Sequence, residues 1–312
     1  MIIGLDIMGG DYAPMAPLQG LDLAFANLPD YVSILLIGDS QIAQEYLHHH
    51  DLNSDRIKLI HTTQVIEMGE SPTKALQTKT DSSIMLGLKM LQAGEMDIFV
   101  SAGNTGAVFV GALYTVKAIP GVLRPALSSI LPKEDGGNNV ILDVGANADC
   151  KADVLVQFGI LGQIYAKTIL DIENPRVGLM NIGSEPEKGN LLMQATYQAL
   201  AQDERVNFAG NIEGYDLFND KAEVIVCDGF TGNIVLKTAE TVYSIMKRRG
   251  LTDSYFQRYD YENYGGTPIL GVNKPVMIMH GVSNPQAFAS TLSSCVQMVN
   301  SHLVDKIKLA FQ

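Results

Sequence analysis

The fold is decided by one stretch near the middle of the chain: Gly178-Leu179-Met180-Asn181-Ile182-Gly183-Ser184-Glu185-Pro186-Glu187-Lys188-Gly189-Asn190. The pattern predicts an apolar strand over Arg176–Met180, a polar loop, and a helix that opens near Asn190. In an open α/β sheet such a loop is where ligands bind, because the N–H groups at the helix start have no partner within the helix. Lys188 adds a positive charge, which favours an anion such as phosphate. The alternative is a solvated connection that carries a surface lysine.

The same alternation of strand and helix patterns runs from end to end of the chain, which is typical of a mostly parallel α/β sheet with helices on both faces, an αβα arrangement. The predicted strands are Ile2–Ile7, Val32–Ile37, Ile57–His61, Ile98–Ser101, Val140–Val144, Arg176–Met180, Val206–Phe208, Val224–Cys227 and Val276–His280. No linker interrupts them, so we predict a single domain over residues 1–312. The rhythm changes at an antiparallel excursion near 123–139 and at an irregular helical and aromatic segment near 244–264.

Polar residues with glycine follow nearly every predicted strand. These endings are Asp6-Ile7-Met8-Gly9-Gly10-Asp11, Ser101-Ala102-Gly103-Asn104-Thr105-Gly106, Asp143-Val144-Gly145-Ala146-Asn147, Asn181-Ile182-Gly183, Gly210-Asn211-Ile212-Glu213-Gly214, Asp228-Gly229-Phe230-Thr231-Gly232-Asn233 and His280-Gly281-Val282-Ser283-Asn284. The carboxyl ends of parallel strands meet at one edge of a sheet, so we expect a shared cleft that the glycine-bearing backbone approaches closely.

The composition excludes several classes of function. The net charge of −12 argues against broad nucleic-acid binding and against a surface that adsorbs generally to membranes. Cys150, Cys227 and Cys295 follow no metal spacing and fit a reducing compartment. No apolar run approaches the ~20 residues that a spanning helix needs. We therefore expect a cytoplasmic protein whose cysteines bind no metal.

Taken together, the loops resemble the phosphate acyltransferase family (PlsX), enzymes that make acyl phosphate from acyl-acyl carrier protein. The matching motifs run in family order: the loops after Asp6 and Ser101, then Arg124-Pro125-Ala126, the loop after Asp143, Asn181 to Asn190, Cys227 to Asn233, Tyr264-Gly265-Gly266 and His280-Gly281. The resemblance implies a fold similar to isocitrate dehydrogenase and phosphotransacetylase, and a homodimer. The segment between Met246 and Tyr264 is shorter than the helical tip that family members are thought to press onto the membrane, so we expect contact with the inner face of the membrane to be peripheral at most. The resemblance also implies a reaction that needs no metal or cofactor.

The implied reaction is attack of inorganic phosphate on the thioester of a fatty acyl chain carried by acyl carrier protein. The acyl phosphate would then serve phospholipid synthesis through a downstream membrane acyltransferase. Phosphate is already an oxygen nucleophile, so the site needs positioning and charge neutralisation more than a base. The catalytic candidates are Lys188, which would hold phosphate or the developing oxyanion, and Asn104, whose amide would donate a hydrogen bond. The alternative for Asn104 is a helix cap.

The other substrate-binding candidates are loop residues with small, amide, carboxylate or cationic groups. They are Gly9, Gly10, Asp11, Gly103, Thr105, Gly106, Arg124, Asn147, Asn181, Gly183, Glu185, Asn190, Asn211, Asp228, Thr231, Asn233 and His280. Arg124 would clamp phosphate, or only form an ion pair. His280 would protonate the leaving thiolate, or only end a strand. Cys150 has no activating base in its local sequence, which argues against an acyl-enzyme.

The carrier-docking candidates are Lys247, Arg248 and Arg249, the densest basic run in the chain. Acyl carrier proteins are strongly negative, so an acidic catalyst needs a local positive surface to bind them. The alternative is that the run only favours a helix C-terminus.

Two competing functions remain open. A nucleotide-dependent dehydrogenase would lack its usual Gly-x-Gly-x-x-Gly motif at the first helix. A non-catalytic interaction protein would leave the polar loops without a purpose.

Overall fold

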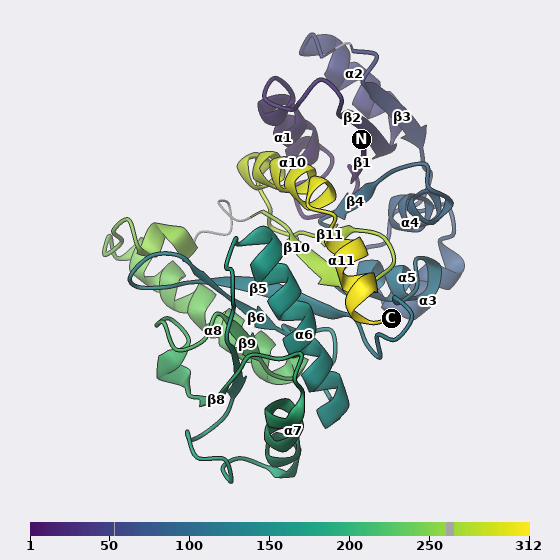
Figure 1. Cartoon of the computed structure of the whole chain (residues 1–312). Coiled ribbons are helices and arrows are strands. Elements are labelled where there is room, and N and C mark those ends of the chain that lie inside the picture. The colour runs from purple at the N-terminus through teal and green to yellow at the C-terminus, as the bar shows by residue number, and fades with distance from the viewer. Residues whose placement is uncertain (53, 260–264) are drawn as a thin grey trace. The chain divides into compact units, whose positions relative to one another are not determined.

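The computed structural model describes residues 1–52, 54–259 and 265–312 (Figure 1). Contacts divide the chain into two compact units. Unit 1 comprises Met1–Ala118 and the described residues of Tyr261–Val304, and unit 2 comprises the described residues of Ile119–Asp260 with Asp305–Gln312. The composition of the sequence does not change at the boundaries between these units. The expectation of a single domain over residues 1–312 stays a prediction.

Unit 1 is built on a mostly parallel sheet. Its strands are β1 (Ile2–Asp6), β2 (Ser33–Gly38), β3 (Ile57–His61), β4 (Ile98–Ser101), β10 (Thr267–Leu270) and β11 (Val276–Ile278), in the order β3-β2-β1-β4-β11-β10. Only the pairing of β10 with β11 is antiparallel among these neighbours. β1, β2 and β4 are almost wholly buried, as expected of parallel strands covered on both faces.

The helices of unit 1 are held by side-chain caps and close packing. They are α1 (Met15–Phe25), α2 (Ser40–His49), α3 (Pro72–Thr78), α4 (Ser83–Ala93), α5 (Thr105–Thr115) and α10 (Pro285–Asn300), and α11 (Leu303–Ala310) crosses into unit 2. Ser82 and Asn284 cap α4 and α10, because their side-chain oxygens accept from the N–H groups of Met85 and Ala287. α1 and α10 lie side by side (Figure 1), and a Cβ on Gly20 would come within 2.3 Å of the Phe288 Cβ.

Within unit 2 the strands pair in the order β5-β6-β9-β7-β8. Its strands are β5 (Ala126–Pro132), β6 (Asn138–Leu142), β7 (Val177–Met180), β8 (Phe208–Ile212) and β9 (Val224–Val226). Its helices are α6 (Ala152–Ile169), α7 (Leu191–Gln202) and α8 (Gly229–Arg248), with short 3-10 turns η1 (Gly214–Asp216) and η2 (Phe256–Tyr259). β5 is antiparallel to β6 and the other pairs are parallel, so the predicted antiparallel excursion is confirmed.

Two strands differ from the sequence prediction. β8 lies at Phe208–Ile212 rather than Val206–Phe208, because pairing with β7 draws Gly210 and Asn211 into a strand against their weak strand preference. β10 is absent from the prediction because Pro268 interrupts its pattern.

The irregular aromatic segment is described only up to Tyr259, and residues 260–264 lie outside the described structure. Before that point, α8 runs to Arg248 and η2 packs against the turn between β5 and β6. The Tyr255 and Tyr259 hydroxyls lie 2.6 Å apart, and the Arg258 guanidinium donates to the Lys133 carbonyl oxygen at 2.9 Å. The described aromatic residues therefore serve unit 2 as packing groups.

Candidate functional site

The glycine-rich strand ends of unit 1 gather around one buried carboxylate, Asp6. Its Oδ2 accepts a hydrogen bond from the Ser101 hydroxyl at 2.7 Å and its Oδ1 accepts from the Met8 N–H at 2.9 Å. Burial raises the pKa of the Asp6 carboxyl, against the lowering effect of these donors. A Cβ on Gly9 would lie 2.5 Å from the Gly103 nitrogen, so the two loops meet backbone to backbone.

Asn104 lies at the start of α5 and is buried. Its Oδ1 accepts from the Ala107 N–H at 3.0 Å, which confirms the helix-cap alternative. Its Nδ2 donates to the carbonyl oxygens of Glu67, Met68 and Glu70 at 3.0 to 3.1 Å. A role as donor to a substrate would require one of these bonds to break, and that role stays a prediction.

The remaining candidates of unit 1 border the same strand ends. The Asp11 N–H donates to the Gly281 carbonyl at 2.7 Å, and Gly10 takes a φ of +100° to permit this approach. His280 and Thr105 are exposed. A Cβ on Gly106 would lie 2.6 Å from the Pro72 ring, so Gly106 serves the packing of α5 on α3.

A second buried carboxylate, Asp143, organises the loops of unit 2. Its Oδ1 accepts from the N–H groups of Leu127 (3.1 Å) and Ala146 (3.2 Å). Its Oδ2 accepts from both the backbone N–H (2.6 Å) and the side-chain amide (2.9 Å) of Asn147. The Asn147 carbonyl in turn accepts from the Gly229 N–H at 2.8 Å. Asn147 thus ties the loop after β6 to the start of α8, and burial raises the pKa of the Asp143 carboxyl.

The first turn of α8 carries three predicted site residues. Asp228 caps the helix, because its Oδ1 accepts from the Thr231 N–H at 2.7 Å. Asn233 is exposed and lies over Gly145, where a Cβ on the glycine would be 3.6 Å from the Asn233 Cγ. Asn233 therefore presents an amide at the strand-end edge of unit 2.

Lys188 lies exposed on the loop between β7 and α7. Its backbone N–H donates to the Glu185 carbonyl at 3.1 Å, and its own carbonyl accepts from the Asn181 Nδ2 at 3.1 Å. The Asn211 Nδ2 donates to the Glu185 carbonyl at 2.8 Å. A Cβ on Gly183 would lie 2.8 Å from the Lys188 Cγ, so the lysine stem rests on Gly183. Within the described residues no carboxylate forms an ion pair with the Lys188 ammonium, which leaves its charge available to an anion.

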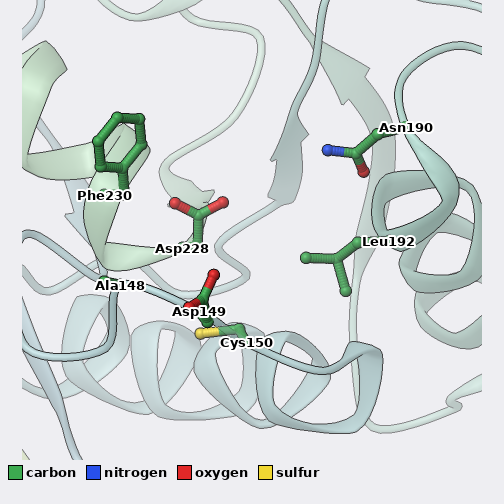
Figure 2. Close-up of a pocket in the computed structure, with 7 residues that line it drawn as sticks. All are labelled: Ala148, Asp149, Cys150, Asn190, Leu192, Asp228 and Phe230. Atoms are coloured by element: carbon green, nitrogen blue, oxygen red, sulfur yellow. The ribbon is translucent and has the colours of Figure 1, made fainter.

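A cavity of about 360 Å³ opens in unit 2 (Figure 2). Its lining residues are Ala148, Asp149, Cys150, Asn190, Leu192, Asp228 and Phe230. Of these, the sequence candidates include Asn190 and Asp228, whereas Ala148, Leu192 and Phe230 are additional. Each additional residue lies one or two positions from a predicted loop or cap residue, which is the signal that could have found it.

Comparison with known proteins decides the family. The sequence profile described as "Fatty acid synthesis protein" matches residues 1–306. A protein of Halothermothrix orenii named phosphate acyltransferase is 40% identical over 99% of this chain and 98% of its own length. One of Streptococcus agalactiae with the same name is 41% identical over the same shares. The chain belongs to the phosphate acyltransferase family of enzymes.

Solved structures show the fold of this family member. A phosphotransacetylase from Streptococcus pyogenes superposes with a TM-score of 0.68 at 18% identity, over 98% of this chain and 94% of that one. The EutD phosphotransacetylase from Staphylococcus aureus gives a TM-score of 0.62 at 17% identity, over 96% and 94%. The predicted α/β fold of the phosphotransacetylase kind is therefore confirmed.

In this phosphate acyltransferase family member, Cys150 is a poor nucleophile. Burial, followed by the charges of Asp143 and Asp228, raises the pKa of its thiol to about 11. The nearby Arg124 opposes this rise, and its Nη1 donates to the Asp149 carbonyl at 3.0 Å. Arg124 is exposed beside the cavity and bonds to backbone there.

The basic run lies at the opposite end of α8 from Asp228. Lys247 and Arg248 occupy the last turn, Arg249 is the C-cap, and all three are exposed. The position agrees with the helix-terminus alternative. A helix of 20 residues is about 30 Å long, so the run and the cavity are separated by the length of α8.

In the described part of the chain, no helix combines the length and apolar character needed to span a bilayer. Within the same residues, no group of three His, Cys, Asp or Glu side chains comes together as metal ligands would. The expectation that the reaction needs no metal or cofactor stays a prediction.

Proposed function

We propose that this protein transfers a fatty acyl group from acyl-acyl carrier protein to inorganic phosphate and so supplies acyl phosphate for phospholipid synthesis. The observation that carries the proposal is the similarity to proteins named phosphate acyltransferase along 99% of the chain. The acyl carrier protein as donor comes from the family resemblance of the strand-end loops. A nicotinamide-dependent reaction has no comparable support.

The chemistry is a direct displacement. A phosphate oxygen attacks the thioester carbon, a C–O bond forms, the C–S bond breaks, and the leaving thiolate takes up a proton. Lys188 supports this step because its ammonium has no carboxylate partner among the described residues and can neutralise phosphate or the developing oxyanion. Direct attack also fits Cys150, whose raised pKa keeps it as a thiol near neutral pH.

Substrate binding is proposed at the strand-end loops of both units. In unit 1 the loops of Gly9, Gly103 and Gly281 present backbone at close approach. In unit 2 the exposed side-chain amide of Asn233 and the capped N-terminus of α8 lie at the strand ends. The side chains of Asn104, Asn147, Asn181 and Asn211 hold these loops in shape through backbone carbonyls or a buried carboxylate. Their contribution to binding is therefore expected to be through loop geometry.

Carrier docking is proposed along α8. Arg248 and Arg249 supply exposed positive charge at its C-terminal end, which suits an acidic carrier. From there an exposed apolar row of Ile245, Val242 and Ile234 leads toward the cavity, at spacings that place these side chains on one helix face. The row supports a carrier that lies along the helix.

The test of the proposed function is an assay with acyl-acyl carrier protein in the presence and absence of phosphate. Acyl phosphate is trapped with hydroxylamine and free thiol is measured in parallel. We expect equal amounts of both products, and only when phosphate is present. Thiol release at the same rate without phosphate would indicate a thioesterase. Quenching or enhancement of nicotinamide fluorescence on titration would favour the dehydrogenase alternative.

We also propose a homodimer with two-fold symmetry in the cytoplasm, which hands its product to a membrane acyltransferase. Light scattering at micromolar concentration is expected to give twice the mass of 33.8 kDa. A monomer mass across that range would contradict the dimer.

A further inference from the structure

The cavity in unit 2 has two chemically different sides. Figure 2 shows the carboxylates of Asp149 and Asp228 on one side, with Asn190 and Leu192 on the other. The volume of about 360 Å³ lies within the range of about 300–1,000 Å³ that is usual for small-molecule sites. Phe230, which is 64% exposed, adds an aromatic surface at the carboxylate side.

The charge of the cavity disfavours phosphate. Two carboxylates line it, and neither Lys188 nor Arg124 is among the lining residues. Arg124 instead donates to the Asp149 backbone carbonyl from outside. Since like charges repel strongly at short distance, a phosphate dianion would bind elsewhere in the protein.

The oxygen and the nitrogen of the Asn190 side-chain amide have different roles. Its Oδ1 accepts from the Met193 N–H at 2.9 Å and so caps α7. Its Nδ2 points into the cavity, toward the side that carries Asp228 (Figure 2). The cavity thus offers a donor on one side and acceptors on the other.

This arrangement matches a secondary amide, whose carbonyl accepts and whose N–H donates. The carbonyl would accept from the Asn190 Nδ2, the N–H would donate to Asp149 or Asp228, and methylene groups would lie against Leu192 and Phe230. We propose that the cavity binds an uncharged, amide-bearing arm of the pantetheine type, on which the carrier holds its thioester. This inference rests on the proposed function: the amide groups of the arm would lie in the cavity, and its thioester end would extend to the place where phosphate binds.

The substitution that tests it is Asn190→Asp. Aspartate is as good a helix cap as asparagine, so the bond from Met193 and the stability of α7 are kept. The inward donor becomes a carboxylate oxygen, which can no longer serve a carbonyl. The matched control is Asn284→Asp, which makes the same change at the cap of α10 in unit 1, where Asn284 Oδ1 accepts from Ala287 at 3.0 Å.

Binding of D-pantetheine is measured by calorimetry for the three proteins, with melting temperatures recorded in parallel. We expect the parent protein and Asn284→Asp to bind within twofold of each other, and Asn190→Asp to bind at least about tenfold more weakly at an unchanged melting temperature. Absence of binding to the parent, or equal binding to Asn190→Asp, would overturn the inference. Tighter binding of the cation cysteamine than of pantetheine would overturn it too, because the cavity would then be a cation site.

The phosphate-dependent assay separates this inference from the proposed function. Under both proposals, Asn190→Asp raises the KM for acyl-acyl carrier protein and leaves the KM for phosphate within twofold. If the enzyme is active but Asn190→Asp binds pantetheine as tightly as the parent protein, only the assignment of the cavity is overturned. Pantetheine binding that depends on Asn190 in a protein without phosphate-dependent activity supports the cavity and overturns the proposed function.

Discussion

Gly232 lies so close to Asp143 that a Cβ on the glycine would come within 1.9 Å of the Asp143 carbonyl oxygen. The first turn of α8 therefore rests directly on the end of β6, with no side chain between them. The same helix carries Asp228 and Phe230 into the cavity. The contact between Gly232 and Asp143 fixes one wall of that cavity.

Gly232→Ala should destabilise unit 2 even though alanine favours helices. Overpacking costs about 1–3 kcal/mol, and the 1.9 Å approach to backbone argues for the upper part of this range, which exceeds the ~1 kcal/mol that alanine gains over glycine in a helix. The matched control is Gly214→Ala in η1, where a Cβ would meet nothing within 4 Å and stability should stay within about 0.5 kcal/mol or rise. Urea unfolding measures both. Equal stability of the two variants would show that α8 can shift away from β6 at little cost.

Lys188→Ala is expected to lower kcat by ~100-fold or more if the ammonium stabilises charge in the transition state. Stability should change by less than about 0.5 kcal/mol, because the side chain is exposed and only its stem packs on Gly183. The control is Lys167→Ala, which removes an exposed lysine at the end of α6 and should leave kcat unchanged. Full activity in Lys188→Ala would remove this lysine from the mechanism.

Alkylation of Cys150 should be slow at neutral pH and should accelerate with pH. Because the pKa of the thiol is raised to about 11, the reactive thiolate fraction increases about tenfold per pH unit between pH 7 and 10. Asp228→Asn should lower this pKa and speed the reaction at pH 8, because it removes a negative charge that disfavours the thiolate and keeps a helix cap. Mass spectrometry after iodoacetamide treatment measures the rate, and a plateau below pH 9 would instead indicate an activated thiol.

Charge reversal at Arg248 and Arg249 should raise the KM for acyl-acyl carrier protein several-fold at low salt and flatten its salt dependence. The KM for phosphate should stay unchanged. The control reverses Lys58 and Lys167, two exposed lysines elsewhere, so that the net charge changes equally. If both double variants behave alike, the effect is one of total charge and docking lies away from α8. Loss of the homodimer in the Arg248 and Arg249 variant would assign the surface to the subunit contact.

Much of the fold could be predicted because local chemistry and tertiary pairing agree. Asn190 caps α7 where the sequence pattern predicts that a helix opens, and β3 has the predicted bounds. The prediction missed β10 and shifted β8, because pairing with a neighbouring strand there overrides the preferences of Pro268 and Gly210.

The candidate site was harder to predict, since residue type does not reveal which way an amide points. Asn104, Asn181 and Asn211 all have the chemistry of substrate donors, yet their amide hydrogens are directed to backbone carbonyls. The burial of Asp6 and Asp143 could not be predicted from residue type either. Only the fold shows that these carboxylates lie buried behind the loops they hold. Phe230 had no pattern of its own, and the cavity reveals it only through the position of α8.

The sheet of unit 1 also sets an order of events during synthesis on the ribosome. β4 ends at Ser101, but its neighbour β11 begins at Val276, after almost all of unit 2 has been made. At about 5–20 residues per second, this leaves one side of β4 without its strand partner for about 9–35 seconds. Through that interval one edge of β4 is open to pairing with other chains, so the sheet of unit 1 is completed only after unit 2 has been translated.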